Sequence, residues 1–205
     1  VLHGLKRKIL EKIMFPLGEM KKEQVRELAF AANLSVADKP DSVEICFVPD
    51  GDHAKMIKKR MPDLNRPGMI VDESGKSLAT HDGIERFTIG QRKGLGFATG
   101  QRKYVLKIVA EENKVVVGEM EGLLAKGLKA TGVNWQATIP MNVQINCEAQ
   151  IRYRHKAAPA KVIRLSEEAA EVEFETSQSA VTPGQAVVFY DGNRVLGGGW
   201  IDEAL

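Results

Sequence analysis

Apolar and polar side chains alternate without a break through Val143-Gln144-Ile145-Asn146-Cys147-Glu148-Ala149-Gln150-Ile151-Arg152-Tyr153-Arg154. Successive side chains of a β-strand point to opposite faces, so this period of two predicts a strand with one buried face. Cys147 and Tyr153 belong to the apolar set of this strand, and Arg152 belongs to the polar set. The stretch therefore predicts β structure in the last third of the chain.

Further strand-like runs follow at residues 161–165, 170–174, 186–190 and 195–201. Turns such as Thr182-Pro183-Gly184 and Asp191-Gly192-Asn193 separate them. A closed barrel leaves no strand edge unpaired, so we expect residues 119–205 to form a small β-barrel. Glycines 197–199 run into Trp200 rather than into a helix, which predicts a bend of the barrel and not a phosphate-binding loop.

The middle of the chain mixes helix and strand signals and predicts a small α+β domain at residues 51–118. Its expected elements are a short basic helix capped by Asp52 and ending at Arg60, a strand at 69–71, and a hairpin of 104–110 and 114–117.

The first fifty residues predict the end of an α/β domain. Apolar residues at helical spacing between Leu2 and Ile13 predict one helix, residues 25–32 a second, and residues 43–48 a strand. An open sheet normally has more strands, and the sequence starts at Val1 inside a helical pattern. We therefore expect a fragment with three domains, at 1–50, 51–118 and 119–205, the first being a remnant of a nucleotide-binding domain.

Composition excludes several classes of protein. The formal net charge of +2 argues against a uniformly basic nucleic-acid-binding protein. No apolar stretch approaches the roughly 18 residues of a membrane helix, and no signal peptide is recognisable, so we expect a cytoplasmic protein without a membrane partner. The two cysteines are far apart and the four histidines lack ligand spacing, so no disulfide framework or metal site is predicted. We interpret the histidines as surface or loop residues.

Cys46 is the first candidate for chemistry. In the predicted strand 43–48 it lies on the face opposite Ile45 and Phe47, and it precedes a Pro-Asp-Gly turn at the strand end. Open α/β sheets place active sites at such ends, although a lone cysteine is more often a small buried hydrophobe. Cys147 is in phase with a buried strand face and is expected to be an inert core thiol.

Two basic segments are candidates for binding a polyanion. Residues 88–96 combine glycines with Gln91, Arg92 and Lys93, and no acidic residue occurs between Arg86 and Lys107. Arginine and lysine supply phosphate contacts, although a solvated loop explains the pattern equally well. The segment 152–156 places an aromatic ring between cations, which suits stacking on unpaired bases; a solvated cationic strand edge is the alternative.

Several stretches, in order along the chain, resemble the tRNA-specific 2-thiouridylase family. They are residues 15–19, 37–42, 45–47, 88–96, 134–135, 151–154, 180–189 and 196–199. Gly-Gln-Arg-Lys-Gly-Leu-Gly and Val-Thr-Pro-Gly-Gln are the most specific of them.

The resemblance implies a fold and an activity. It implies the end of an adenine-nucleotide hydrolase-like α/β domain, a central α+β domain, and a barrel like the second domain of translation elongation factors. Cys46 would accept sulfur as a persulfide, from a sulfur-relay protein or a cysteine desulfurase, and deliver it to a wobble uridine of tRNA activated by ATP. A second cysteine, in the amino-terminal domain of the family, would release that sulfur as hydrosulfide or through a disulfide. Arg152, Tyr153 and Gln185 would contact tRNA, as would Gln91, Arg92 and Lys93.

The sequence also departs from the family. The Ser-Gly-Gly-x-Asp-Ser nucleotide loop is absent from these residues, so the chain alone is not expected to bind ATP or to thiolate tRNA. Glu44 replaces the usual glycine before Ile-Cys-Phe, and a nearby carboxylate raises a thiol pKa. The competing hypothesis is a noncatalytic RNA-binding module with a structural cysteine.

Overall fold

A computed structural model describes residues 2–40, 53–60, 66–97, 100–153 and 156–205. The helices are α1 (Arg7–Leu10), α2 (Lys22–Ala31) and α3 (His53–Arg60), with short 3-10 turns η1 (Leu2–Gly4), η3 (Ile84–Arg86) and η4 (Met120–Leu123). The strands are β1 (Gly68–Val71), β2 (Ser77–His81), β3 (Tyr104–Val109), β4 (Lys114–Gly118), β5 (Leu124–Trp135), β6 (Gln144–Gln150), β7 (Ala158–Arg164), β8 (Ala170–Ser179), β9 (Ala186–Asp191) and β10 (Arg194–Ala204).

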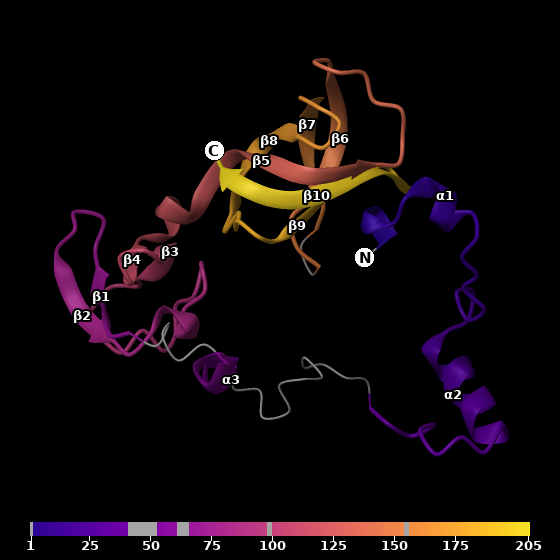
Figure 1. Cartoon of the computed structure of the whole chain (residues 1–205), viewed down its shortest axis with the longest axis horizontal. Coiled ribbons are helices and arrows are strands. Elements are labelled where there is room, and N and C mark those ends of the chain that lie inside the picture. Colours follow the sequence, from indigo (N-terminus) through magenta and orange to yellow (C-terminus); the bar gives the residue numbers. More distant parts are fainter. Residues whose placement is uncertain (1, 41–52, 61–65, 98–99, 154–155) are drawn as a thin grey trace.

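The predicted barrel is confirmed. Strands β5 to β10 close in the order β10-β5-β8-β7-β6-β9, and every pair in the ring is antiparallel (Figure 1). Phe189, Leu128 and Ile151 are among the fully buried side chains of its core. Burial of large apolar side chains of this kind is the dominant source of stability.

The glycine run, for which the sequence predicted a bend of the barrel, lies in a barrel strand at an irregularity of its pairing. Residues 197–199 lie in β10, whose pairing with β5 shifts register between Gly198 and Trp200. A Cβ at Gly199 would lie 2.6 Å from the carbonyl oxygen of Thr131. Only glycine therefore lets β10 and β5 approach so closely.

The limits of β6 differ from the predicted alternation. The strand ends at Gln150, and Tyr153, assigned to the apolar face, is 93% exposed. Val143 is also exposed, at 47%. Arg152 and Tyr153 thus lie in a turn beyond the strand, not on its faces.

A second sheet with the order β2-β1-β4-β3 forms beside the barrel. The predicted hairpin is confirmed as β3 and β4, and the predicted basic helix as α3. Strand β1 pairs parallel with β4 although more than forty residues separate them along the chain. Ile70, Val105 and Val115 are fully buried between this sheet and the segment that follows η3.

The interpretation of the histidines is wrong for His81, which is only 8% exposed at the end of β2. Its Nδ1 accepts a hydrogen bond of 3.1 Å from the N–H of Gly83. Its Nε2 lies 3.2 Å from the carbonyl oxygen of Asn113, which can only accept, so the proton is on Nε2. Because both ring nitrogens have partners, the imidazole can be buried at little cost. The Phe87 ring packs against the imidazole, with 5.1 Å between the two ring centres.

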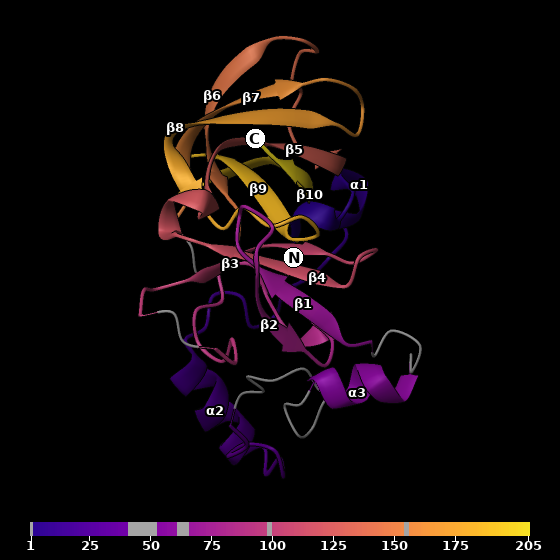
Figure 2. The same ribbon diagram turned by 90° about the vertical axis from the view of Figure 1, so that its left-hand side faces the viewer.

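The amino-terminal segment is only partly as predicted. Helix α2 is confirmed, but the expected first helix is a 3-10 turn followed by the four residues of α1. Neither α1 nor α2 buries a side chain, and α2 lies apart from both the sheet and the barrel in Figures 1 and 2. A short helix gains most of its stability from tertiary packing, which explains why the first one is so short. The predicted strand 43–48 and the Asp52 cap lie outside the described residues.

Candidate nucleic-acid interface

One groove on the barrel brings together three predicted site residues from two separate segments of the sequence. Arg152, Tyr153 and Gln185 all line it. Its lining also includes Val188 of β9 and Ile151, the residue that follows β6, whose side chain is buried in the barrel core. The groove therefore combines a cation, an aromatic ring and an amide beside an apolar side chain, that of Val188.

The turn after β6 holds Arg152 and Tyr153 outward. Ile151, 1% exposed, anchors this turn in the barrel core. The Gln150 side chain donates through Nε2 to the carbonyl oxygen of Tyr153 at 3.4 Å, and its Oε1 accepts from the Tyr190 hydroxyl at 3.3 Å. Because Ile151 is fixed in the core, the next two side chains, those of Arg152 and Tyr153, are exposed.

The turn before β9 positions Gln185. Gly184 has a φ of +82°, a left-handed conformation that glycine adopts without strain. The N–H of Gly184 donates to the carbonyl oxygen of Ile201 at 2.8 Å, and the N–H of Ile201 donates to that of Gln185 at 2.8 Å. These bonds join the predicted Pro-Gly turn to β10 and hold Gln185 at the groove.

The amino-terminal segment also reaches this groove, through His3. The side-chain amide of Asn134 donates to the carbonyl oxygens of His3 and Leu5, at 2.6 and 2.9 Å. The amide of Gln136 donates to the same two oxygens, at 3.3 and 2.6 Å. We call these four hydrogen bonds the amide clamp. Burial lowers the pKa of His3.

Sequence reasoning missed His3, Asn134 and Gln136. Positions 134 and 135 belong to one of the stretches that resemble the family, and a hydrogen bond between groups some 130 residues apart has no local sequence signal. Two amides two residues apart, one in β5 and one just beyond its end, form a pattern that is common on surfaces.

The basic loop, residues 88–96, is organised by Gln91. Its Oε1 accepts from the N–H of Thr88 at 2.9 Å, and its Nε2 donates to the carbonyl oxygen of Lys93 at 3.0 Å. The N–H of Gly90 donates to the carbonyl oxygen of Val105 in β3, and the N–H of Val105 donates to the carbonyl oxygen of Gln91. These two bonds attach the loop to the sheet. Arg92 and Lys93 are exposed, whereas the Gln91 amide is used within the loop.

A second groove lies next to this loop. It is lined by Arg92, Arg102 and Lys103 together with glycines 94, 96 and 100. Lys103 Nζ is 3.8 Å from a carboxylate oxygen of Glu119. Of the three residues predicted in the loop, Arg92 lines this groove, and the groove shares no lining residue with the barrel groove.

The structure describes only one of the two cysteines, Cys147. Cys46 lies outside the described residues. Cys147 is a free thiol, partly buried against the barrel core, as predicted. Burial raises its pKa to about 11, with Glu148 acting in the same direction. A thiol with so high a pKa is a poor nucleophile at neutral pH.

Within the described ranges, no group of three or more His, Cys, Asp or Glu residues could hold a metal ion. In the same part of the chain, no helix is both long and apolar enough to span a membrane.

Three family models match consecutive parts of the chain. The tRNA methyl transferase HUP domain matches residues 1–50, the tRNA methyl transferase PRC-barrel domain matches 54–119, and the aminomethyltransferase beta-barrel domain matches 125–201.

Curated relatives match over the whole chain. The tRNA-specific 2-thiouridylase MnmA of Carboxydothermus hydrogenoformans is 48% identical over 207 residues, covering 100% of this chain and 56% of the relative. The protein of the same name from Geotalea uraniireducens is 47% identical over 204 residues, covering 100% of this chain and 54% of the relative. This chain thus spans about half the length of these relatives. The agreement of the three models with the relatives shows that the chain belongs to the tRNA-specific 2-thiouridylase family.

Proposed function

We propose that this chain is the sulfur-accepting and tRNA-binding part of a tRNA 2-thiouridylase, an enzyme that replaces the 2-oxygen of the wobble uridine with sulfur. The observation that carries the proposal is the meeting of Arg152, Tyr153 and Gln185 in one groove. The relatives' name, tRNA-specific 2-thiouridylase, supports this reaction. Because the proposed substrate is tRNA, we propose that the protein acts in the cytoplasm.

The groove has the chemistry that unpaired RNA requires. A guanidinium such as that of Arg152 binds phosphate or stacks on a base, an exposed phenol ring such as that of Tyr153 stacks on a base, and the amide of Gln185 can hydrogen-bond to a base edge. The second groove, with Arg92, Arg102 and Lys103, offers further phosphate contacts.

In the proposed reaction, Cys46 receives sulfane sulfur as a persulfide from a relay protein or a desulfurase. ATP adenylates the uridine 2-oxygen, which turns it into a good leaving group. The terminal sulfur of the persulfide then bonds to carbon 2 and AMP leaves, while a second thiolate breaks the sulfur–sulfur bond and forms a disulfide with Cys46. We assign no residue of this chain to ATP and expect no thiolation by the chain alone.

Binding to tRNA tests the proposal. The probe is a tRNA transcript with an unmodified wobble uridine, titrated across a salt series. We expect Arg152→Ala and Gln185→Ala to weaken binding about tenfold each. Arg152→Ala should also lower the salt slope, the steepness with which the logarithm of the affinity falls with the logarithm of the salt concentration, by about one. Lys76→Ala, in the turn between β1 and β2, is the charge control. Equal affinity of all four proteins would refute the role of the groove.

Alkylation of the same samples tests the sulfur site. A persulfide acceptor must be accessible, so Cys46 should react promptly in the folded protein. Labelling of Cys46 only after unfolding would favour the noncatalytic RNA-binding module.

A further inference from the structure

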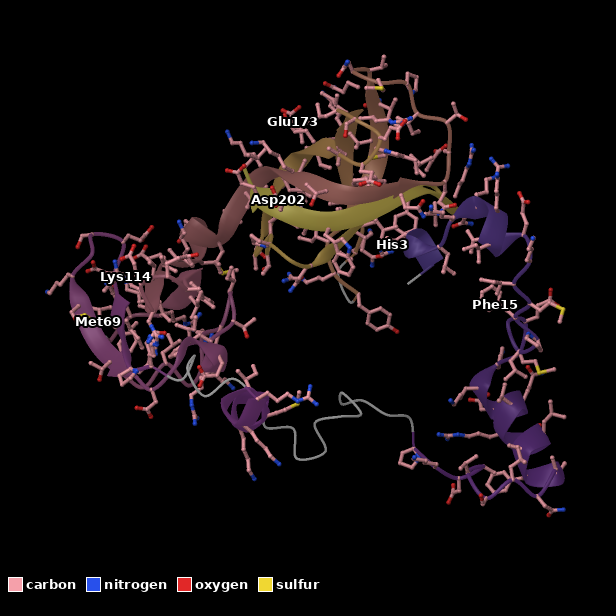
Figure 3. All side chains as sticks on the ribbon, in the orientation of Figure 1. His3, Phe15, Met69, Lys114, Glu173 and Asp202 are labelled. Carbon is pink, nitrogen blue, oxygen red and sulfur yellow. The ribbon has the colours of Figure 1, made fainter. Side chains whose placement is uncertain are left out.

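The barrel groove is completed by a residue from the other end of the chain. His3 lines it beside Tyr153 and Gln185, although it belongs to the segment that matches the HUP domain and not to the barrel. Figure 3 shows His3 between the start of the chain and the barrel, and η1 packs against β10 and β5. The groove is thus formed by two parts of the protein.

The amide clamp is what attaches this segment. Each side-chain NH₂ group has two hydrogens and each carbonyl oxygen has two lone pairs, so the four bonds use all of these donors and lone pairs. Asn134 and Gln136 are half-buried, and buried or half-buried hydrogen bonds are costly to leave unmade. The clamp therefore fixes the backbone of residues 3–5 without using the His3 ring.

The His3 ring takes no part in the amide clamp and is free to contact a ligand. A Cβ at Gly198 would come within 2.9 Å of its Cδ2, so the glycine makes room for the ring. Its Nδ1 is buried and has no hydrogen-bond partner among the described residues. A hydrogen bond to a ligand would thus fall to Nε2, and the flat face of the ring is suited to contact a base.

We infer that Asn134 and Gln136 are positioning residues that clamp the amino-terminal segment to the barrel, so that the His3 ring contacts an unpaired nucleotide of RNA held in the Tyr153–Gln185 groove. The inference rests on the proposed function, and it adds to it a contact from a different domain. Val188, a partly exposed apolar residue in the lining of this groove, favours a nucleobase over a bare phosphate at this place.

Two kinds of variant separate the ring from the clamp. His3→Ala removes the ring and leaves both carbonyl oxygens clamped, whereas the double variant Asn134→Ala/Gln136→Ala removes the clamp and leaves the ring. Because either amide alone can bind both carbonyls, each single substitution should have a small effect and the pair a larger one. Gln144→Ala/Asn146→Ala, at exposed positions of β6, is the matched control.

The experiment measures affinity for the same tRNA transcript together with hydrogen exchange of residues 2–6. We expect His3→Ala to weaken binding about tenfold with unchanged exchange. The clamp variant should lose at least as much affinity and also exchange faster in this segment. His3→Phe should keep part of the affinity if the ring stacks, because it retains a flat ring without Nε2.

The outcomes are distinct. If Arg152→Ala weakens binding but His3→Ala and the clamp variant bind as the wild type does, the inference is overturned and the proposed function stands. If the wild type does not bind tRNA, both fall. Should the clamp variant not fold, as judged by its thermal transition, His3→Ala decides alone.

Discussion

The guanidinium carbon of Arg164 lies 5.9 Å from the centre of the Trp135 ring, and Nη1 of the same side chain donates a 3.1 Å hydrogen bond to the carbonyl oxygen of Ile139. Its Nε also donates to the carbonyl oxygen of Ser166 at 3.0 Å. One side chain thus joins the end of β5, the loop that follows it, and the turn after β7. The arginine supports the barrel, although a cation near an aromatic ring resembles an RNA-binding site.

We therefore predict that Arg164→Ala lowers the free energy of unfolding by about 1–3 kcal/mol through the lost hydrogen bonds and cation–π contact. Affinity for tRNA should not change. Chemical denaturation beside the binding titration checks both. Arg194→Ala, at the exposed first position of β10, is the control, expected within about 0.5 kcal/mol of wild type. Weakened tRNA binding at unchanged stability would instead make Arg164 an RNA contact.

His81 gives a second prediction about stability. Its ring has a partner at each nitrogen and packs on Phe87, so His81→Ala should cost about 2–3 kcal/mol. Thr80→Ala, at an exposed position of the same strand, should cost much less. In nitrogen NMR spectra of the wild type, the ring should show the Nε2–H tautomer; the Nδ1–H tautomer would contradict the hydrogen-bond assignment.

The sequence predicted the elements whose period is regular and local. Strand β6, the β3–β4 hairpin and helix α2 follow from alternation, a short turn and helical spacing. Strand β5 was not among the strands predicted. Its burial pattern is interrupted where the pairing with β8 shifts register between Ala125 and Gly127, and a shift of one residue moves the side chains to the other face.

Non-local contacts could not be predicted. The apolar phase placed Tyr153 inside, but the chain leaves the barrel after Ile151, so the ring is exposed. The burial of His81 depends on the carbonyl group of Asn113, which lies in the turn between β3 and β4. The alternation of cations with an aromatic ring indicates Arg152 and Tyr153, whereas Gln185 follows only from the resemblance, and only the closed barrel brings the three to one groove.

Cys147 should be nearly unreactive in the folded protein. With a pKa of about 11 its thiolate fraction near pH 7.5 is about 100-fold lower than that of a thiol with a pKa of 9.0. Alkylation followed by peptide mass spectrometry should label Cys147 slowly, and faster in urea. Cys46→Ser leaves Cys147 as the only thiol and isolates its rate. Labelling at the rate of a free thiol would contradict the burial.

The contact between the amino-terminal segment and the barrel should weaken in acid. Burial lowers the pKa of His3 from its usual 6.5. Because the pKa of His3 is lower in the folded protein than in the unfolded chain, the folded protein binds fewer protons at this ring. The contact of the neutral ring therefore contributes fully to stability above pH 6.5, and this contribution decreases as the pH falls below 6.5. Hydrogen exchange of residues 2–6, corrected for intrinsic rates, should lose protection from pH 7 to pH about 5. His3→Phe should remove this dependence; if the variant keeps it, another group is responsible.

Gln91 and Lys93 should affect RNA binding in different ways. The Gln91 amide bonds to Thr88 and Lys93 within the loop, so Gln91→Ala should weaken tRNA binding by disordering the loop, not by removing a phosphate contact. Its salt slope should then match that of the wild type, whereas Lys93→Ala, if Lys93 binds phosphate, should reduce the slope by about one. Gln91→Glu keeps the acceptor for Thr88 but loses the donor to Lys93, and should fall between wild type and Gln91→Ala. A reduced salt slope in Gln91→Ala would mean that the loop needs its order to bring Arg92 and Lys93 to the phosphates at all, because a glutamine side chain itself carries no charge.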